Sequence, residues 1–325
     1  MDANLSFWRA EGQSFFQRFR LWVNVLDPLL LLESSDKIKR RRSLIETNEK
    51  TLNEPIQNNQ VFWSAVKILT FIAILKFVHP DTGKIIPVLF RPPAFMPVSL
   101  PLVIVSSLHY QAKQTFVFQF IFHTYTTGFT LLNGNGTTKA EDFSVLHKQI
   151  AYSVGAISYA ACVGALPLIF TNRYKFKSAL TELFIRKLLP ASLLGVTGAF
   201  TTAVVRSPEF ENGIEVMDGN GKVVGVSRNA GEKAVKETAL SRGVLFGTTF
   251  FLTEVLVHFV QRAKFVKNPR ALAAMRILVT TSVLTGMIPI SFSMFPQCGE
   301  IKRADLEPEI LSSTEETELF YNRGV

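Results

Sequence analysis

Long hydrophobic windows alternate with short charged connectors from residue 95 onward. Four of these windows hold few ionisable residues, and each is close to the ~20 residues that a helix needs to cross ~30 Å of hydrocarbon. They are residues 150–170, 188–205, 243–260 and 276–295. The pattern therefore predicts an all-α polytopic membrane protein whose transmembrane domain covers residues 95–295.

The number of crossings depends on residues 95–132. Two apolar stretches, 95–110 and 115–132, are separated only by residues 111–114, a break too short to predict two separate crossings. Prolines make the entry to the first stretch irregular, at Pro92, Pro93, Pro97 and Pro101. The hydrophobic pattern alone thus allows five or six crossings.

The charge of the connectors favours five. The basic regions are 1–94, 171–187 and 261–274, and the neutral or acidic ones are 133–149, 206–242 and 296–325. Because basic connectors gather on one side of a membrane, the two groups alternate only if residues 95–132 change side once. We therefore predict about five transmembrane helices, with the N-terminus on the basic side and the C-terminus opposite.

Three regions outside the windows have patterns of their own. Residues 1–94 predict a helical headpiece, whose first aromatic residues recur at the spacing of one helical face. The connector 206–242 contains GIEVMDGNGKVVGVS, in which alternating apolar residues flank Asp-Gly-Asn-Gly, and this predicts a small β-hairpin. Residues 296–325 are rich in Asp and Glu and predict an acidic C-terminal tail.

Composition excludes several functions. The formal net charge is +9, yet no Lys/Arg stripe interleaves with exposed aromatic residues, so nucleic acid is not an expected partner. Two cysteines, Cys162 and Cys298, are too few for a disulfide framework or a zinc site. Because no phosphate-binding loop, HExxH or GxSxG is present, we expect neither an enzyme nor a cofactor or metal. The first residues lack a signal-peptide core, so any import signal is expected to be internal.

Ionisable residues inside a hydrophobic window are costly and therefore mark candidate functional positions. Glu254 and His258 are four residues apart in FFLTEVLVHFV and share one helical face, where a carboxylate and an imidazole can pair or share a proton. A coupling or binding role and a buried hydrogen bond between helices both fit this spacing.

A second polar patch lies in the stretch 115–132. His123 and Thr126 are its central members, with Thr124 and Thr127 beside them. The patch is equally compatible with a solute path through the membrane and with hydrogen bonds between helices.

The pentapeptide His79-Pro80-Asp81-Thr82-Gly83 ends the headpiece. Pro80, Asp81 and Gly83 suit the last three positions of a type I turn, which is the simpler interpretation. A proton-handling or metal-binding pair of His79 and Asp81 is the alternative.

This pentapeptide resembles the hallmark of the sideroflexins, multi-pass proteins of the mitochondrial inner membrane. Other family motifs occur in the same order, at Leu26-Asp27-Pro28, Gly213-Ile214, Phe295-Pro296-Gln297 and Phe320-Tyr321-Asn322-Arg323-Gly324-Val325. The resemblance covers essentially the whole chain and is strongest to a divergent branch of the family. It implies an N-terminus in the matrix and a C-terminus in the intermembrane space.

The resemblance implies two different functions. Sideroflexins carry serine and related small amino acids, whereas the divergent branch is associated with respiratory complex I assembly and iron homeostasis. Transporting members have an Asn-x-x-Asn pair in the crossing before the hairpin; aligned on Arg206, this chain has Gly198 and Thr201 in that region. Losing two hydrogen-bond partners, at ~1–2 kcal/mol each, weakens binding by roughly one to two orders of magnitude.

We therefore predict a carrier of a small amino-acid-like solute, with serine a poor substrate. The candidate path would include Glu254, His258, His123 and Thr201. The alternative is a non-transporting membrane scaffold that docks complex I assembly intermediates.

Overall fold

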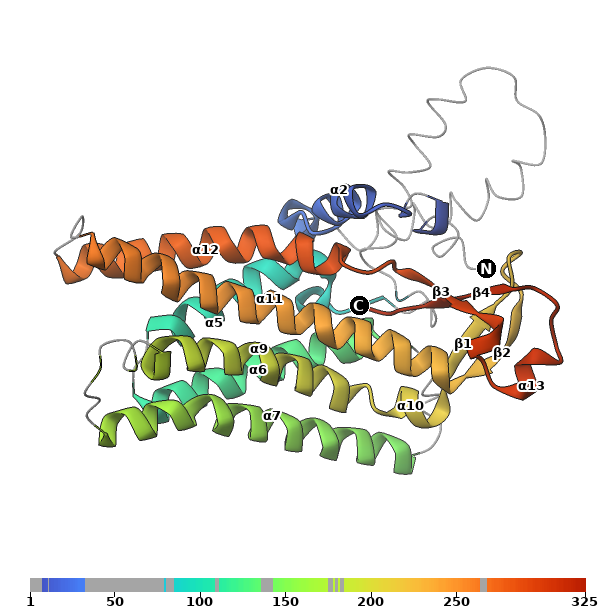
Figure 1. Cartoon of the computed structure of the whole chain (residues 1–325), viewed down its shortest axis with the longest axis horizontal. Helices are drawn as coiled ribbons and strands as arrows, with labels where there is room; N and C mark the ends of the chain where they lie inside the picture. Colours follow the sequence, from blue (N-terminus) through green and yellow to red (C-terminus); the bar gives the residue numbers. More distant parts are fainter. Residues whose placement is uncertain are drawn as a thin grey trace, which may run out of the picture.

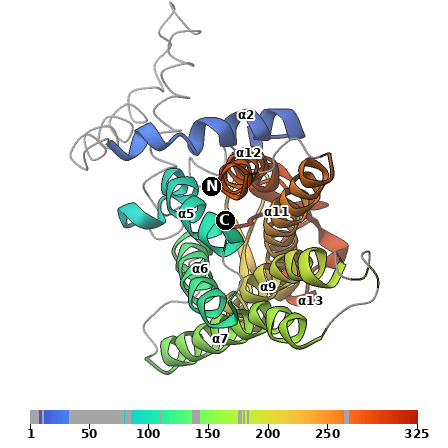
Figure 2. The same ribbon diagram turned by 90° about the vertical axis from the view of Figure 1, so that its left-hand side faces the viewer.

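A computed structural model of the chain describes residues 8–10, 12–32, 79, 85–108, 111–135, 143–174, 178, 181, 184–263 and 268–325. Within these residues, long helices lie side by side in a bundle (Figure 1), and Figure 2 shows them end-on. The bundle helices are α5 (Phe95–Leu108), α6 (Ala112–Asn133), α7 (Phe143–Arg173), α9 (Leu189–Val205), α11 (Arg228–Arg262) and α12 (Pro269–Ser293). A single π-helical turn, η4 (Phe184–Leu188), leads into α9.

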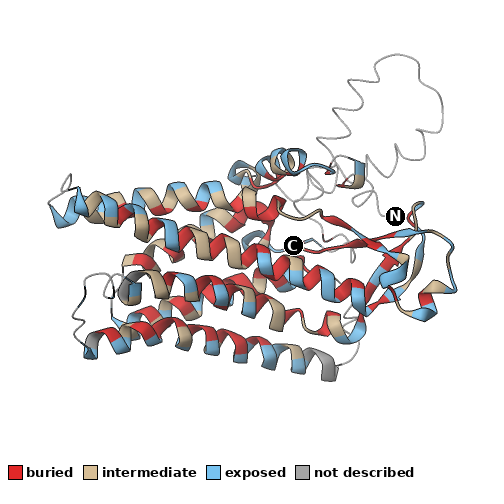
Figure 3. Cartoon of the chain, in the orientation of Figure 1, coloured by how far each residue is buried: buried red, intermediate tan, exposed pale blue. Residues whose placement is uncertain are grey.

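Three described stretches are long and apolar enough to cross a membrane. They are His147–Thr171, Arg228–Arg262 and Pro269–Ser293, and Pro92–Leu108 and Leu189–Val205 are shorter apolar helices. Buried residues line the inward helix faces, as Figure 3 shows. Large hydrophobic side chains are exposed on the outside, among them Val154, Tyr159, Val196, Phe259 and Leu278. Exposed apolar surface of this extent is what a bilayer covers, so the fold is that of a helical membrane protein.

Helices α5 and α6 run antiparallel. The hydroxyl of Tyr125, late in α6, donates to the carbonyl of Ala94 at 3.3 Å, just before α5 begins. Asn133 Nδ2, at the end of α6, donates to the carbonyl of Phe90 at 2.8 Å. The chain thus returns along α6 to the end of the bundle where α5 starts, rather than changing ends once as predicted. Helix α5 is the short arm of this helical hairpin: it has 14 residues, with Pro101 inside it.

The predicted β-hairpin is confirmed. Strands β1 (Ile214–Met217) and β2 (Val223–Ser227) pair antiparallel. Asp218 Oδ1 accepts from the amides of Asn220 and Lys222 at 3.0 and 2.7 Å, which closes the turn. The short helix α10 (Pro208–Asn212) leads into β1 from the end of α9.

The acidic C-terminal tail predicted for residues 296–325 contributes two strands to a sheet. Strands β3 (Cys298–Lys302) and β4 (Glu318–Asn322) join the hairpin in the order β2-β1-β4-β3, with α13 (Pro308–Leu311) between them in sequence. Strand β4 is therefore central and pairs with both β1 and β3. Leu319 and Tyr321 are fully buried, and this burial outweighs the acidic composition of the segment.

Helix α2 (Phe15–Val25) packs against the end of the bundle that carries the sheet. A capping box formed by Ser14 and Gln17 starts the helix. The ring of Trp22 lies 4.8 Å from that of Phe292 in α12. Arg9 donates to the carbonyl of Gly219 at 2.6 Å, and its guanidinium lies 3.7 Å from the centre of the Phe320 ring.

The N-terminal helix and the C-terminal sheet were predicted on opposite sides of the membrane, but the structure brings them into contact. The contacts responsible are local. The guanidinium of Arg9 lies over the Phe320 ring and donates to the Gly219 carbonyl, while Trp22 packs against Trp8 and Phe292. The 3-10 turns η1 (Pro28–Leu32), η2 (Val88–Phe90) and η3 (Pro92–Ala94) are the other headpiece elements described. Residues 1–7, 11, 33–78 and 80–84 lie outside the described residues.

Candidate functional site

A buried polar stripe follows α6. Thr115, Gln119, His123 and Thr127 occur at every fourth position, so they follow one side of the helix over four successive turns. All four are buried, and His123 is completely inaccessible. Each carries at least one buried polar atom without a hydrogen-bond partner among the described residues, and both ring nitrogens of His123 lack one. We call these four residues the α6 stripe.

Neighbouring helices contribute small residues beside the α6 stripe. A Cβ atom built on Gly164 of α7 would lie only 1.6 Å from Gln119 Oε1, so glycine is required where the amide packs. The ring of Phe122 meets His123 edge-on, with 5.3 Å between ring centres. These contacts fix the positions of the side chains but satisfy none of the unpartnered atoms.

Unpartnered buried polar atoms on this scale require an explanation. A buried donor or acceptor without a partner costs about 1–3 kcal/mol, and most such groups in folded proteins are satisfied. Other polar residues of α6 follow that rule: Thr124 Oγ1 donates to the Phe120 carbonyl at 2.8 Å, and Thr126 Oγ1 to the Phe122 carbonyl at 3.1 Å. The α6 stripe therefore differs from the other polar residues of α6, because each of its members has a buried polar atom without a partner among the described residues.

The structure pairs Glu254 with Arg276 rather than with His258, and the bond joins two helices, as the second of the two roles predicted for it requires. Glu254 in α11 forms an ion pair with Arg276 in α12; Nη1 of Arg276 contacts Oε1, and Nη2 donates to Oε2 at 3.2 Å. Arg276 also donates to the carbonyl of Ser107 at 3.4 Å, which joins α5 to the pair. A guanidinium holds a carboxylate with two parallel bonds, which an imidazole cannot match. His258 lies beside Phe259, with 6.3 Å between ring centres.

Gly198 and Thr201 face the helix interface rather than an open path. A Cβ atom on Gly198 would lie 2.9 Å from the ring of Phe246 in α11. Thr201 Oγ1 donates to the Gly198 carbonyl at 3.1 Å, and Thr202 Oγ1 donates to the same carbonyl at 2.9 Å. Thr201 is therefore buried with its hydroxyl already bonded to its own helix.

His79 is buried at the end of α6. Its Nε2 lies 2.7 Å from the carbonyl oxygen of Gly134, so the residue ties residues before α5 to the end of the α5–α6 hairpin. The four residues that follow it, Pro80, Asp81, Thr82 and Gly83, lie outside the described residues, and the turn there stays a prediction. Within the described part of the chain, no three His, Cys, Asp or Glu side chains gather as a metal site would require.

Arginines dominate the sheet end of the bundle. Arg206 donates from Nε and Nη2 to the carboxylate of Glu209 at 2.6 and 2.7 Å. Its Nη2 also donates to the Arg323 carbonyl at 2.7 Å. Arg323 in turn donates to the carbonyls of Phe295 and Phe292 at 3.0 and 3.2 Å. Burial lowers the pKa of Arg323 to about 10, against the opposing charge of Glu237, so it stays charged at neutral pH.

Arg242 in α11 is a further buried arginine, and it has no such partners. Its guanidinium lies over the rings of Phe95, Phe129 and Phe292, at 5.2, 5.5 and 4.2 Å from their centres. Its Nη1 has no hydrogen-bond partner among the described residues. In the sequence, Arg206 and Arg242 sit at the borders of connector 206–242, where they resemble ordinary interfacial charges; only the fold shows that they are buried.

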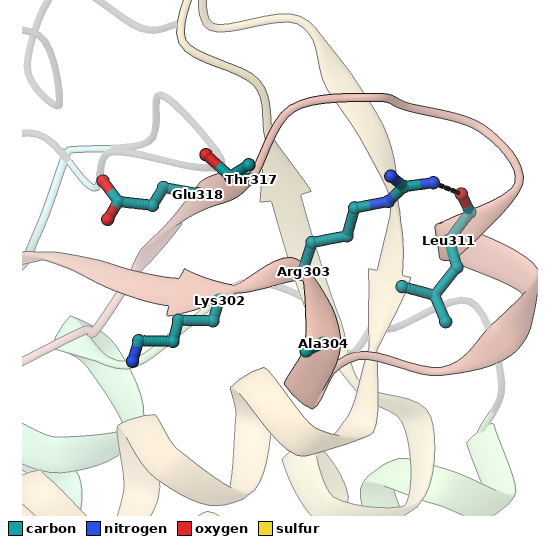
Figure 4. A pocket seen from close by; sticks show the side chains of 6 residues that line it. All are labelled: Lys302, Arg303, Ala304, Leu311, Thr317 and Glu318. Atoms are coloured by element: carbon teal, nitrogen blue, oxygen red, sulfur yellow. Dashed lines mark hydrogen bonds between the residues drawn. The ribbon is translucent and has the colours of Figure 1, made fainter.

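A surface pocket of ~590 Å³ lies on the sheet, away from these groups. Figure 4 shows it lined by residues of the C-terminal segment, namely Lys302, Arg303, Ala304, Leu311, Thr317 and Glu318. The guanidinium of Arg303 is bonded to the carbonyl of Leu311. One atom of this lining, Nε of Arg303, is buried without a hydrogen-bond partner among the described residues.

The fold and its polar interior define a helical membrane protein with a small extramembrane sheet. A family model described as Sideroflexins matches residues 2–325. Sideroflexin-4 of Danio rerio is 44% identical over 100% of both chains, and Sideroflexin-4 of Homo sapiens is 38% identical over 100% of this chain and 93% of its own. Human Sideroflexin-5 is 28% identical over 98% of this chain and 91% of its own. The chain belongs to the sideroflexin family. No solved structure matches it.

Proposed function

We propose that this sideroflexin is a mitochondrial inner-membrane transporter that moves a small amino-acid-like solute past the α6 stripe. The supporting observation is the row of four buried side chains on α6, each with a polar atom that has no partner among the described residues. Retaining such groups in a membrane protein is costly, and in transporters they mark substrate and ion pathways. The family resemblance supports the same class of activity.

Serine is a poor substrate under this proposal. Gly198 has no side chain with which to bind a solute, and its Cα packs close to Phe246. The Thr201 hydroxyl is already bonded to the Gly198 carbonyl. Neither position supplies the amide groups that the resemblance assigns to serine carriers.

The test is uptake of labelled amino acids into proteoliposomes that contain the full-length protein. His123→Phe and Gln119→Leu should each reduce uptake at least tenfold, because an apolar side chain removes the polar atoms from the stripe. Thr124→Val is the matched control: Thr124 is exposed on the same helix and bonds only to its own backbone, so uptake should stay within twofold. Absence of uptake of every amino acid tested would refute the transport proposal.

A non-transporting scaffold for complex I assembly and iron homeostasis is the second candidate. The observation that favours it is that Glu254, Arg276 and Thr201 are already engaged within the protein, so these polar groups serve its own packing. Under this alternative, complex I content in cells lacking the protein is restored equally by wild type and by His123→Phe. Restoration by wild type alone supports transport.

The contact of Arg9 with Gly219 and Phe320 also bears on membrane orientation. We propose that α2 and the sheet face the same compartment, the intermembrane space, and that the basic connectors 171–187 and 261–274 face the matrix. Protease treatment of mitoplasts should then reach tags placed in the hairpin turn at residue 220 and directly before residue 8. Cleavage of only one of the two tags contradicts this arrangement.

A further inference from the structure

The guanidinium of Arg242 is a buried cation without a counter-ion among the described residues. It is 3% exposed, and an arginine remains protonated in proteins. The described side chains include no carboxylate in ion-pair contact with it; the ion pairs of this end join Arg206 to Glu209 and Lys236 to Glu232. The charges that act on Arg242 most strongly are those of two more arginines, Arg323 and Arg206.

Three aromatic rings form one wall of the site. Phe95, Phe129 and Phe292 contact one another, with 4.6 Å between the centres of Phe95 and Phe129 and 5.5 Å between those of Phe95 and Phe292. Their faces attract the cation, but a ring supplies no acceptor for the N–H groups in the guanidinium plane. Nη1 is therefore left as a donor without an acceptor.

Arg242 lies beside helices α6 and α9. Phe129, whose ring contacts the guanidinium, follows Thr127 by two residues in α6 and therefore lies on a different face of that helix from the α6 stripe. A Cβ atom on Gly198 of α9 would lie 3.9 Å from the backbone carbonyl oxygen of Arg242. The helices that carry the α6 stripe and Gly198 thus both approach Arg242, and Arg242 is a separate site from the stripe.

From this geometry we infer that Arg242 binds the carboxylate of a monocarboxylate solute whose apolar part packs on Phe95, Phe129 and Phe292. This inference rests on the proposed transport function and specifies the chemical class of its substrate. The planar fork of a guanidinium matches a carboxylate with two parallel hydrogen bonds. A phosphate is a poorer fit, because the other nearby arginines already hold Glu209 or backbone carbonyls.

The experiment compares propionate with propionamide, which has the same shape without the charge. The purified full-length protein is heated in detergent with each compound at constant ionic strength, and its unfolding temperature is followed by intrinsic fluorescence. A ligand that binds only the folded protein raises this temperature with concentration. Propionate should raise it, while propionamide and equal chloride or phosphate should not.

Variants assign the effect to Arg242. Arg242→Met should raise the half-saturating propionate concentration at least tenfold, and Arg242→Lys should raise it less, because a lysine keeps the charge but not the fork. Arg262→Met, an exposed arginine on the same helix, is the matched control and should behave as wild type. If Arg242→Met does not fold, two measurements still test the inference. They are the difference between propionate and propionamide in the wild type and the half-saturating propionate concentration of Arg242→Lys.

Two results overturn the inference: no propionate-specific shift in the wild type, or an undiminished shift in Arg242→Met. An equal shift with chloride or phosphate also overturns it, because the site is then a general anion site. These outcomes are separate from failure of the transport proposal. Uptake that depends on His123 but not on Arg242 would leave transport standing and remove only the carboxylate site.

Discussion

Two buried polar regions of this protein differ in how completely their groups are paired. At the sheet end, Arg206 bonds to Glu209, to the Thr238 hydroxyl at 2.9 Å and to the Arg323 carbonyl. Along the α6 stripe, four successive turns bury polar atoms that have no partner among the described residues. A fully paired group stabilises the fold that surrounds it, whereas an unpaired one reduces stability and is retained for another reason. This comparison assigns Arg206 to packing and sets the α6 stripe apart from it, although Nε of Arg323 and Nη1 of Arg242 near the sheet end also lack partners among the described residues.

The largest expected effect is at the paired end. Arg206→Met leaves the buried carboxylate of Glu209 without the charge of Arg206 and should lower the free energy of unfolding by about 3–5 kcal/mol. Urea unfolding in detergent measures this. Lys236→Met is the control, because its pair with Glu232 is exposed and should contribute less than about 0.5 kcal/mol. A loss of under 1 kcal/mol in Arg206→Met would make the two polar regions energetically alike.

The next effect concerns the ion pair between α11 and α12. Glu254→Gln removes the carboxylate that pairs with the buried guanidinium of Arg276 and should cost about 1–3 kcal/mol. A double-mutant cycle with Arg276→Met should show a coupling of at least about 0.5 kcal/mol. The same cycle with His258→Phe should show none. Coupling of Glu254 to His258 instead would restore the pairing that the helical spacing alone predicted.

At the α6 stripe the sign of the effect should reverse. Thr127→Val removes a buried hydroxyl without a partner and keeps the shape, so the unfolding free energy should stay level or rise by up to about 1 kcal/mol. Uptake should nevertheless fall. Thr249→Val is the control, since the Thr249 hydroxyl donates to the Leu245 carbonyl at 2.7 Å and its loss gives no stability. A clear loss of stability in Thr127→Val would indicate a bonded hydroxyl.

The hydrophobic pattern predicted much of the helix bundle, and the elements that it failed to predict were missed for physical reasons. The apolar windows located α7, α9, α11 and α12, and the turn residues at 218–221 located the hairpin. The pattern could not show that α5 and α6 form a hairpin, because it depends on contacts between residues 90–95 and 125–133. The acidic composition of the segment concealed β4, in which Glu318 is exposed and the next four residues are buried.

The candidate site was only partly predictable. His123 stood out as an ionisable residue in an apolar window, and the spacing of Thr115, Gln119 and Thr127 could have extended it into a stripe. Arg276 and Arg242 were not singled out, because arginines near the edges of windows usually reach the interface. Partner choice depends on how helices pack, and this is why Glu254 was assigned to the wrong residue.

The smallest expected effect is a pH dependence at the start of α11. Burial disfavours the charged form of Glu307, but hydrogen bonds from Ser227 and from the amides of Arg228 and Asn229 outweigh it and lower its pKa. A lowered pKa contributes stability above the unfolded value of about 4.3, and this is lost as pH falls through the folded value. Because Glu307 is partly exposed, we expect only a few tenths of a kcal/mol. Glu307→Gln should abolish this part of the acid sensitivity in unfolding curves between pH 7 and pH 3.

Strand β4 is synthesised after every strand it pairs with, yet it occupies the middle of the sheet. Residues 318–323 must therefore insert between β1 and β3 once the helices have been made, and the Arg323 carbonyl reaches Arg206 only at that step. A nascent protein stalled before this closure displays two open strand edges and a buried arginine missing one of its acceptors, which distinguishes it from the finished molecule.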